Sequence, residues 1–202
     1  MSPPEPPDAR RDPAGARGSR DEGGDAPPIL PVPPQLDVVV EDLAFVEAEA
    51  IARPVTAELN ATTPLLRRLE LAAGDALGNQ LRAPREPLEV GAAVVSGAGD
   101  LRAQLLVHAV VMSREERVSA DGVRRATLGA LRRAADFEIA HLALPPFGLG
   151  AGNLDVEESA AAMASAIRQH ARRSRWPKRL TVVVENEEER RAFVAALPGE
   201  DR

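Results

Sequence analysis

The sequence predicts an α/β fold, in which a mixed, mostly parallel sheet forms the middle of a three-layer α/β/α sandwich. From residue 103 to residue 197, short apolar runs typical of strands alternate with runs whose apolar residues recur every three or four positions. Such an alternation requires crossover connections, so we expect parallel strands with helices on both faces of the sheet. The short link between 90–96 and 103–111 instead favours a hairpin, which makes the sheet mixed.

The elements follow one another from residue 36. Short apolar runs bounded by proline, glycine or charged residues predict strands at 36–40, 50–55, 90–96, 103–111, 139–144 and 180–184. Apolar residues at helical spacing predict helices at 63–81, 120–137, 156–173 and 187–197. Thr63 followed by Pro64 is typical of a helix start, because the hydroxyl caps the first turn and proline fits its first position.

Composition divides the chain into a tail and a domain. Residues 1–34 hold ten of the 18 prolines. Such a segment has too little apolar surface to offset the entropy of ordering it, so we expect residues 1–35 to be a disordered tail. The tail is either plain solvated chain or a ligand for a proline-reading partner. We expect residues 36–198 to form the domain and residues 199–202 to be a disordered C-terminus.

The overall composition argues against several function classes. The chain has no cysteine, which excludes disulfides, thiolate metal sites and cysteine nucleophiles. A net charge of −6 and 2% aromatic residues are unlike a nucleic-acid binder, so we expect no nucleic-acid partner. The three histidines match no zinc spacing, and we expect neither a metal nor a cofactor. The absence of a long apolar run and of a signal peptide predicts a cytoplasmic protein without a membrane partner.

The glycine-rich loop after the strand at 139–144 is the strongest candidate for a binding site. In open α/β sheets, ligands bind beyond the carboxyl ends of strands, where this loop lies. Glycines allow positive φ and a close approach of the backbone to a ligand. Consecutive N–H groups can hold an anion, and we expect the next helix to add its positive N-terminal end. The alternative is a tight turn that needs glycine for geometry alone.

The sequence around this loop resembles the phosphate loop of macro domains. The stretch ALPPFGLG at 143–150 fills the family's strand-and-loop frame, and Glu157-Glu158 falls at the start of the next helix in register. Four further segments agree with the family in order: VEDL at 40–43, LELAAG at 69–74, LEVGAAV at 88–94 and LVHAV at 106–110. The resemblance covers residues 36–197 and implies the same sandwich fold that the alternation of elements predicts.

The resemblance implies a binding module for ADP-ribose, free or linked to protein, or for a related nucleotide diphosphate. It implies that Asp42 accepts a hydrogen bond from the adenine amino group and that Leu43 offers its backbone N–H to the ring. Phe147 would line the pocket. The backbone of the loop would hold the diphosphate: Gly148, Leu149, Gly150, Ala151, Gly152 and Asn153.

The sequence departs from the family where many members carry V-N-A-A-N and then a glycine-rich stretch. Arg53 and Thr56 replace both asparagines, and residues 60–64 (NATTP) replace the glycines. The departure puts hydrolysis of ADP-ribose derivatives in doubt, so we lean against an enzyme and expect no catalytic residue. Arg53 either contacts the phosphates in place of asparagine or is a surface residue. A degenerate fold that serves as a protein-interaction scaffold is the third hypothesis.

One basic cluster stands outside this site, and it could either dock an acidic partner or nucleic acid, or be a solvated helix end. It comprises Arg168, Arg172, Arg173, Arg175, Lys178 and Arg179.

Overall fold

The computed structural model describes residues 32–75, 77, 81, 86–150 and 154–197. The expected tail at 1–35 thus lies almost wholly outside the described residues, as does the C-terminus from 198. One sheet has the strand order β1-β6-β5-β2-β4-β3. Its strands are β1 (Gln35–Val40), β2 (Ala50–Thr56), β3 (Ala93–Gly97), β4 (Leu105–Met112), β5 (His141–Leu144) and β6 (Arg179–Val184). The helices are α1 (Pro64–Ala72), α3 (Ala120–Asp136), α4 (Val156–Ala171) and α5 (Glu187–Ala196).

The sheet is mixed, as the sequence predicts. Every neighbouring pair of strands is parallel except β3 and β4, which form the expected hairpin. The carboxyl ends of β1, β6, β5, β2 and β4 therefore lie at one edge of the sheet, called the carboxyl edge below. Loops that start at this edge can converge on one ligand.

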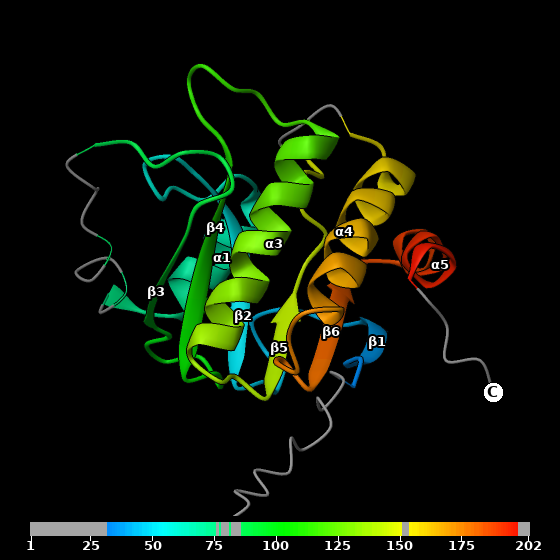
Figure 1. Ribbon diagram of the computed structural model, residues 1–202. Coiled ribbons are helices and arrows are strands. Elements are labelled where there is room, and N and C mark those ends of the chain that lie inside the picture. Colours follow the sequence, from blue (N-terminus) through cyan, green and yellow to red (C-terminus); the bar gives the residue numbers. More distant parts are fainter. Residues whose placement is uncertain (1–31, 76, 78–80, 82–85, 151–153, 198–202) are drawn as a thin grey trace, which may run out of the picture. The chain divides into compact units, whose positions relative to one another are not determined.

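Helices cover both faces of the sheet, and this confirms the three-layer prediction (Figure 1). In Figure 1, α3 and α4 lie in front of the sheet and α1 lies behind it. Side chains of β2 alternate between the two layers, since Ala50 and Ala52 belong to the larger core cluster and Ile51 belongs to the cluster under α1. Among the described helices, none is long and apolar enough to cross a membrane.

The first helix is shorter than its apolar pattern predicts. It ends at Ala72 rather than at residue 81, and Gly74 follows with a φ of +76°. This position favours glycine because of its backbone angle, since residues with a Cβ rarely adopt a positive φ. The apolar pattern continues past the helix because Leu77 is buried under the same face of the sheet.

Candidate functional site

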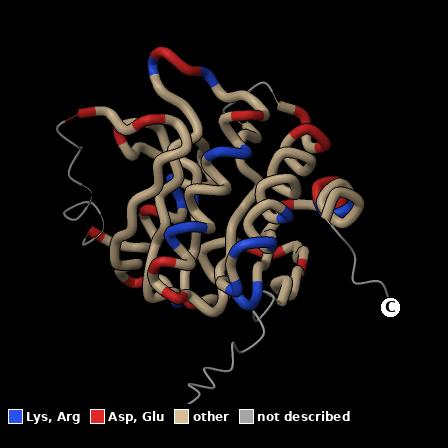
Figure 2. Tube along the Cα trace, in the orientation of Figure 1, with Lys and Arg blue, Asp and Glu red and all other residues tan. Residues whose placement is uncertain are grey.

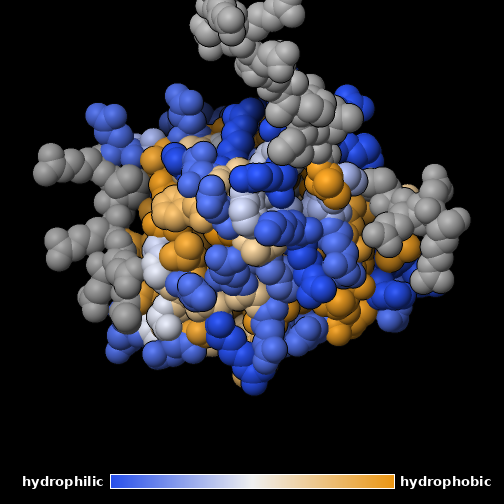
Figure 3. Space-filling view, turned by 60° about the horizontal axis from the view of Figure 1, so that its bottom comes forward, coloured by the Kyte–Doolittle hydropathy of each residue, from blue (hydrophilic) through white to orange (hydrophobic). Residues whose placement is uncertain are grey.

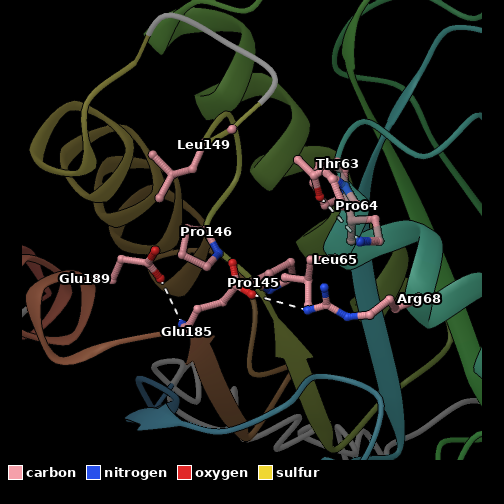
Figure 4. A pocket seen from close by; sticks show the side chains of 12 residues that line it. Thr63, Pro64, Leu65, Arg68, Pro145, Pro146, Leu149, Glu185 and Glu189 are labelled. Carbon is pink, nitrogen blue, oxygen red and sulfur yellow. Dashed lines mark hydrogen bonds and ion pairs between the residues drawn. The ribbon is translucent and has the colours of Figure 1, made fainter.

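A cleft of about 300 Å³ opens at the carboxyl edge, between α1 and the loop that follows β5 (Figure 4). In Figure 4, Thr63 and Pro64 lie on one side of it and Leu149 on the other. Its volume is at the lower end of the range for small-molecule sites. The lining residues are Pro54, Thr63, Pro64, Leu65, Leu66, Arg68, Pro145, Pro146, Leu149, Gly150, Glu185 and Glu189.

The loop after β5 has the backbone conformation that its glycines allow. Gly148 has a φ of +87° and Gly150 a φ of +73°. A Cβ at Gly148 would lie 2.8 Å from Val123 Cγ2, so a larger residue there would push the loop off α3. Gly150 is exposed, and its Cβ would meet only Thr63 Cγ2, at 3.3 Å. The loop therefore packs against the protein at Gly148 and faces α1 at Gly150.

Two residues of this loop, Leu149 and Gly150, line the cleft. The N–H groups of Gly148, Leu149 and Gly150 donate to no acceptor within the described residues. The loop is held instead through Phe147, whose carbonyl accepts a 2.8 Å hydrogen bond from Ser159 Oγ of α4. The Phe147 N–H points to Met163 Sδ, 3.2 Å away. The loop is thus anchored through Phe147, while the amides of the next three residues have no partner in the described part of the chain.

The N-terminus of α1 faces the cleft. Thr63 caps it, since Thr63 Oγ1 accepts the N–H of Leu66 at 3.3 Å and Thr63 O accepts the N–H of Arg67 at 3.1 Å. The N–H of Leu65 has no acceptor within the described part of the chain, and the first turn carries no acidic residue. The partial positive charge of this helix end is therefore directed at the cleft.

The N-terminus of α4, which we expected to supply this charge, is occupied by its own carboxylates. Asp155 and Glu158 form a capping box, with Glu158 N–H to Asp155 Oδ1 at 2.8 Å and Asp155 N–H to Glu158 Oε2 at 3.2 Å. Glu157 adds another negative charge to the same turn. The expectation for α4 was wrong because acidic side chains already complement its dipole.

The far end of the cleft carries acceptors and one cation. Glu185 follows β6, and its N–H donates to Glu189 Oε2 at 2.9 Å. Arg68 Nη2 of α1 lies 3.5 Å from Glu185 Oε1, with side-chain exposures of 60% and 55%. An ion pair that long and that exposed holds its partners weakly. The carboxylates suit hydroxyl or amino donors, and Arg68 is able to turn to an anion.

Arg53, one of our two expected replacements for asparagine, lies inside the protein, and neither alternative for it was correct. Its side chain is fully buried, with Nε 2.8 Å from His108 Nδ1, Nη1 2.5 Å from Glu70 Oε1 and Nη2 3.3 Å from the carbonyl of Leu59. The strand places it there because odd-numbered side chains of β2 point to the α1 side. Arg53 thus joins β2 to β4 and α1 and does not line the cleft.

His108 is the second buried polar side chain of this cluster. Its Nδ1 accepts from Arg53, so the ring proton sits on Nε2 and donates to Ser96 Oγ at 2.7 Å. Ser96 Oγ in turn donates to the carbonyl of Gly97 at 3.0 Å. Burial, and then the nearby charge of Arg53, lowers the pKa of His108 from 6.5 to about 3. The ring is therefore neutral at physiological pH.

Three further expected residues lie away from the cleft lining. Thr56 Oγ1 accepts the N–H groups of Glu58 and Asn60, both at 3.3 Å, so it braces its own turn. Phe147 is fully buried in the larger core cluster and does not line the cleft, whereas Pro146 before it and Leu149 after it do. Asp42 is exposed at the end of β1, and its Oδ1 accepts the N–H of Ala44 at 2.9 Å.

Of the remaining expected site residues, some line the cleft and some do not. The side chain of Leu43 is buried, and its N–H donates to no acceptor in the described part of the chain. It lies at the carboxyl edge, since the N–H of Glu41, two residues before it, donates to Val184 O at the end of β6. Leu149 and Gly150 line the cleft as expected. Ala151, Gly152 and Asn153 lie outside the described residues.

Sequence reasoning missed half of the cleft. It placed Thr63 and Pro64 at a helix start but gave that helix end no role, although no acidic residue follows it. It also gave no role to Glu185, which directly follows a strand that ends at the carboxyl edge. Both features could have been found by applying the strand-end rule to every strand and not only to the one with glycines.

Comparisons with known proteins agree on one family. A family model described as Macro domain matches residues 60–163. An uncharacterised protein of Aeropyrum pernix is 32% identical over 156 residues, which are 76% of this chain and 80% of that protein. An uncharacterised protein of Mycobacterium tuberculosis is 30% identical over 168 residues, 83% of this chain and 46% of that one. The chain therefore spans about half the length of its mycobacterial relatives.

More distant matches include an enzyme and macrodomains of known structure. An O-acetyl-ADP-ribose deacetylase of an Enterobacter species is 27% identical over 169 residues, covering 81% of this chain and 94% of that enzyme. A solved Oceanobacillus iheyensis macrodomain superposes with a TM-score of 0.72 at 17% identity, covering 80% of this chain and 89% of that one. A Trypanosoma brucei macrodomain in complex with ADP-ribose gives 0.70 at 12% identity, covering 79% and 67%. These structural matches establish the fold.

Proposed function

This chain belongs to the macro domain family, and from that membership we propose that it is a binding module for ADP-ribose or a related nucleotide diphosphate. The observation that carries the proposal is the set of unused N–H groups at the cleft. The amides of Leu149 and Gly150 come from one side and that of Leu65 from the other. Backbone donors that converge at a helix N-terminus are a common way of holding phosphate groups.

The two ends of the cleft suit the two kinds of group in such a ligand. The amide end is free of acidic side chains among the described lining residues, and it fits the diphosphate. The other end has the Glu185 and Glu189 carboxylates, which accept from ribose hydroxyls or an adenine amino group. Arg68 lies at this end as well, and its guanidinium can pair with a phosphate oxygen. An inorganic anion alone would use only half of the cleft.

The relatives support this choice of ligand. A macrodomain of the same fold is solved with ADP-ribose bound. We propose that Asp42 and the N–H of Leu43 extend the site beyond the cleft along the carboxyl edge, where the base of the ligand would lie. The alternative is that the altered segment at 60–64 has turned the fold into a scaffold for protein interactions.

Isothermal titration calorimetry with ADP-ribose tests the proposal directly. We expect a saturable signal with one site per chain and a smaller signal for adenosine, which lacks the diphosphate. Absence of heat up to millimolar ADP-ribose would remove the binding role and leave the scaffold as the better account. A parallel thermal melt serves as a control, because a ligand that binds only the folded chain raises its apparent stability.

Similarity to the deacetylase raises a second candidate, an enzyme that removes a group from an ADP-ribose derivative. Neither of the two residues that stand at the asparagine positions reaches the cleft, because Arg53 is buried and Thr56 braces a turn. We therefore propose binding without turnover. Incubation with O-acetyl-ADP-ribose, followed by chromatography, decides between the two, and release of acetate above the uncatalysed rate would establish an enzyme.

A further inference from the structure

A second surface stands out at the opposite edge of the sheet, near the point where α3 and α4 end. Residues 159–184 contain six basic residues and no aspartate or glutamate, in a chain whose net charge is −6. Five exposed cations gather around this helix pair and are called the basic surface here: Arg132, Arg172, Arg173, Arg175 and Lys178. In Figure 2 the blue segments of the trace mark basic residues at this end, and Figure 3 shows hydrophilic residues across the centre of the corresponding face.

A hollow of about 290 Å³ lies between the two helices and is lined by one cation from each side. Arg132 of α3 and Arg173 after α4 both line it, together with the uncharged polar side chains of Gln169 and Ser174. The carboxylate at its rim, Asp136, is already paired with Arg133, whose Nη1 lies 3.1 Å from Asp136 Oδ2. The hollow thus presents positive charge and hydrogen-bond donors to the solvent.

The cations of the basic surface have no acidic partners of their own. Within the described residues, none of the five takes part in an ion pair. The other arginines of α3 do: Arg124 and Arg125 pair with Asp121, and Arg133 pairs with Asp136. Favourable interaction with the negative helix ends accounts for a cation or two at this place, but not for five without partners.

The turn that carries four of these cations is held rigidly. His170 Nε2 donates to the carbonyl of Trp176 at 2.7 Å, and Ser174 Oγ donates to the same carbonyl at 3.1 Å. The N–H of Lys178 donates to Ala140 O at 2.9 Å. The cations therefore project from a preformed backbone, which lowers the entropy lost when they bind a partner.

Trp176, which is partly exposed, stands among these cations. The Lys178 ammonium lies 4.5 Å from the centre of its ring, and the Arg175 guanidinium lies 6.0 Å away. Cation–π contacts of this kind hold the two side chains beside the ring. A base that stacks on the ring would bring its phosphates next to both cations.

We propose that the basic surface binds the phosphodiester backbone of a single-stranded nucleic acid. Four of its five cations are arginines, whose planar forks match phosphate oxygens better than an ammonium group does. Basic residues interleaved with an exposed aromatic ring are typical of single-strand binding and are not needed for an acidic peptide. The expectation of no nucleic-acid partner came from the net charge of the whole chain and from its low aromatic content, and neither figure shows where the charged and aromatic residues lie.

Fluorescence anisotropy with a labelled single-stranded RNA of about 15 nucleotides, long enough for one binding site, tests this inference on the full chain. The double variant Arg132→Glu/Arg173→Glu should lose at least about tenfold in affinity and should show a shallower dependence on salt. Its matched control is Arg190→Glu/Arg191→Glu on α5, which makes the same change of charge on another helix and should bind like the wild type. Trp176→Leu should weaken binding about fivefold or more.

Three results would overturn the inference. One is no binding of the RNA at low salt, and another is an equal loss of affinity in both double variants. The third is competition by a polyglutamate peptide that is as effective as unlabelled RNA, because it would assign the surface to an acidic protein. Thermal melts of each variant confirm folding. None of these results depends on ADP-ribose, since the cleft lies at the other edge of the sheet.

Discussion

Arg53 Nε donates a 2.8 Å hydrogen bond to His108 Nδ1 between the neighbouring strands β2 and β4. We had named Arg53 as a candidate for contacting a phosphate, but this contact shows that it belongs to the interior of the protein. Through the same guanidinium, the strand pair is connected to Glu70 on α1, the helix whose N-terminus faces the cleft. The cluster therefore holds α1 against the sheet beside the cleft. We expect its loss to lower the stability of the fold before it affects ligand binding.

Arg53→Met should lower the free energy of unfolding by about 3 kcal/mol, because it leaves His108 and Glu70 without their donor. Urea unfolding followed by circular dichroism measures the change. Arg67→Met on the exposed face of α1 is the matched control and should change stability by less than about 0.5 kcal/mol. Equal effects of the two substitutions would show that the buried cluster has no special role.

Stability should fall as the pH falls below neutrality. His108 has a pKa lowered from 6.5 to about 3 in the folded chain, so between these values the unfolded chain binds a proton there and the folded chain does not. The free energy of unfolding should therefore fall by up to about 1.4 kcal/mol per pH unit over this window from this group alone. Burial also lowers the pKa of His141 and His170, which adds to the same trend.

Urea midpoints measured from pH 7 to pH 4 check this dependence. His108→Gln keeps an acceptor for Arg53 but does not titrate, so its stability should change less with pH than that of the wild type. A variant whose pH dependence equals that of the wild type would mean that His108 is not the group responsible.

Ser159→Ala should loosen the loop that lines the cleft. The substitution removes the 2.8 Å hydrogen bond to Phe147 O and leaves that buried carbonyl without a partner, which costs about 1–3 kcal/mol. Ser165→Ala on the same helix, where the hydroxyl makes no hydrogen bond within the described residues, is the control. Calorimetry should also show weaker ADP-ribose binding for Ser159→Ala alone. Unaltered affinity would indicate that the loop keeps its shape without this anchor.

Arg68→Gln should reduce affinity for ADP-ribose about tenfold, the usual effect of removing one hydrogen bond to a charged group. The neighbouring Arg67, which is exposed and does not line the cleft, provides the comparison. Arg67→Gln should bind like the wild type. If both variants lose affinity equally, only the general charge of α1 matters, and the contact that we assign to Arg68 is absent.

The fold could be predicted from the sequence because its signals are local. The apolar period of each helix, the Thr63-Pro64 start and the short link between β3 and β4 all depend on near neighbours. The site could be predicted only in part, because its other half is built from α1 and from Glu185, which lie far from the glycine loop in sequence. Arg53 shows the limit most clearly. The identity of one residue does not show which face of a strand its side chain is on, nor which side chains it will contact there. Both facts decide the role of Arg53.

The acidic cap of α4 shows a different limit. Asp155 and Glu158 are visible in the sequence, but the same carboxylates support a helix start and repel a phosphate. The glycines next to α4 made its N-terminus the obvious candidate for an anion site. The role of the Leu65 amide on α1 follows only from the fold, which places this helix and the loop on opposite sides of one cleft.

The central claim is that backbone amides at the cleft hold the ligand's phosphates, and Gly150 tests it most directly. Gly150→Glu and Gly150→Gln place nearly identical side chains at the same φ of +73°, so strain is matched and only the charge differs. Calorimetry with ADP-ribose should find no binding for Gly150→Glu and measurable, weakened binding for Gly150→Gln, with both variants folded by thermal melt. Equal affinities of the two variants would contradict the claim, because a carboxylate beside the phosphates must repel them.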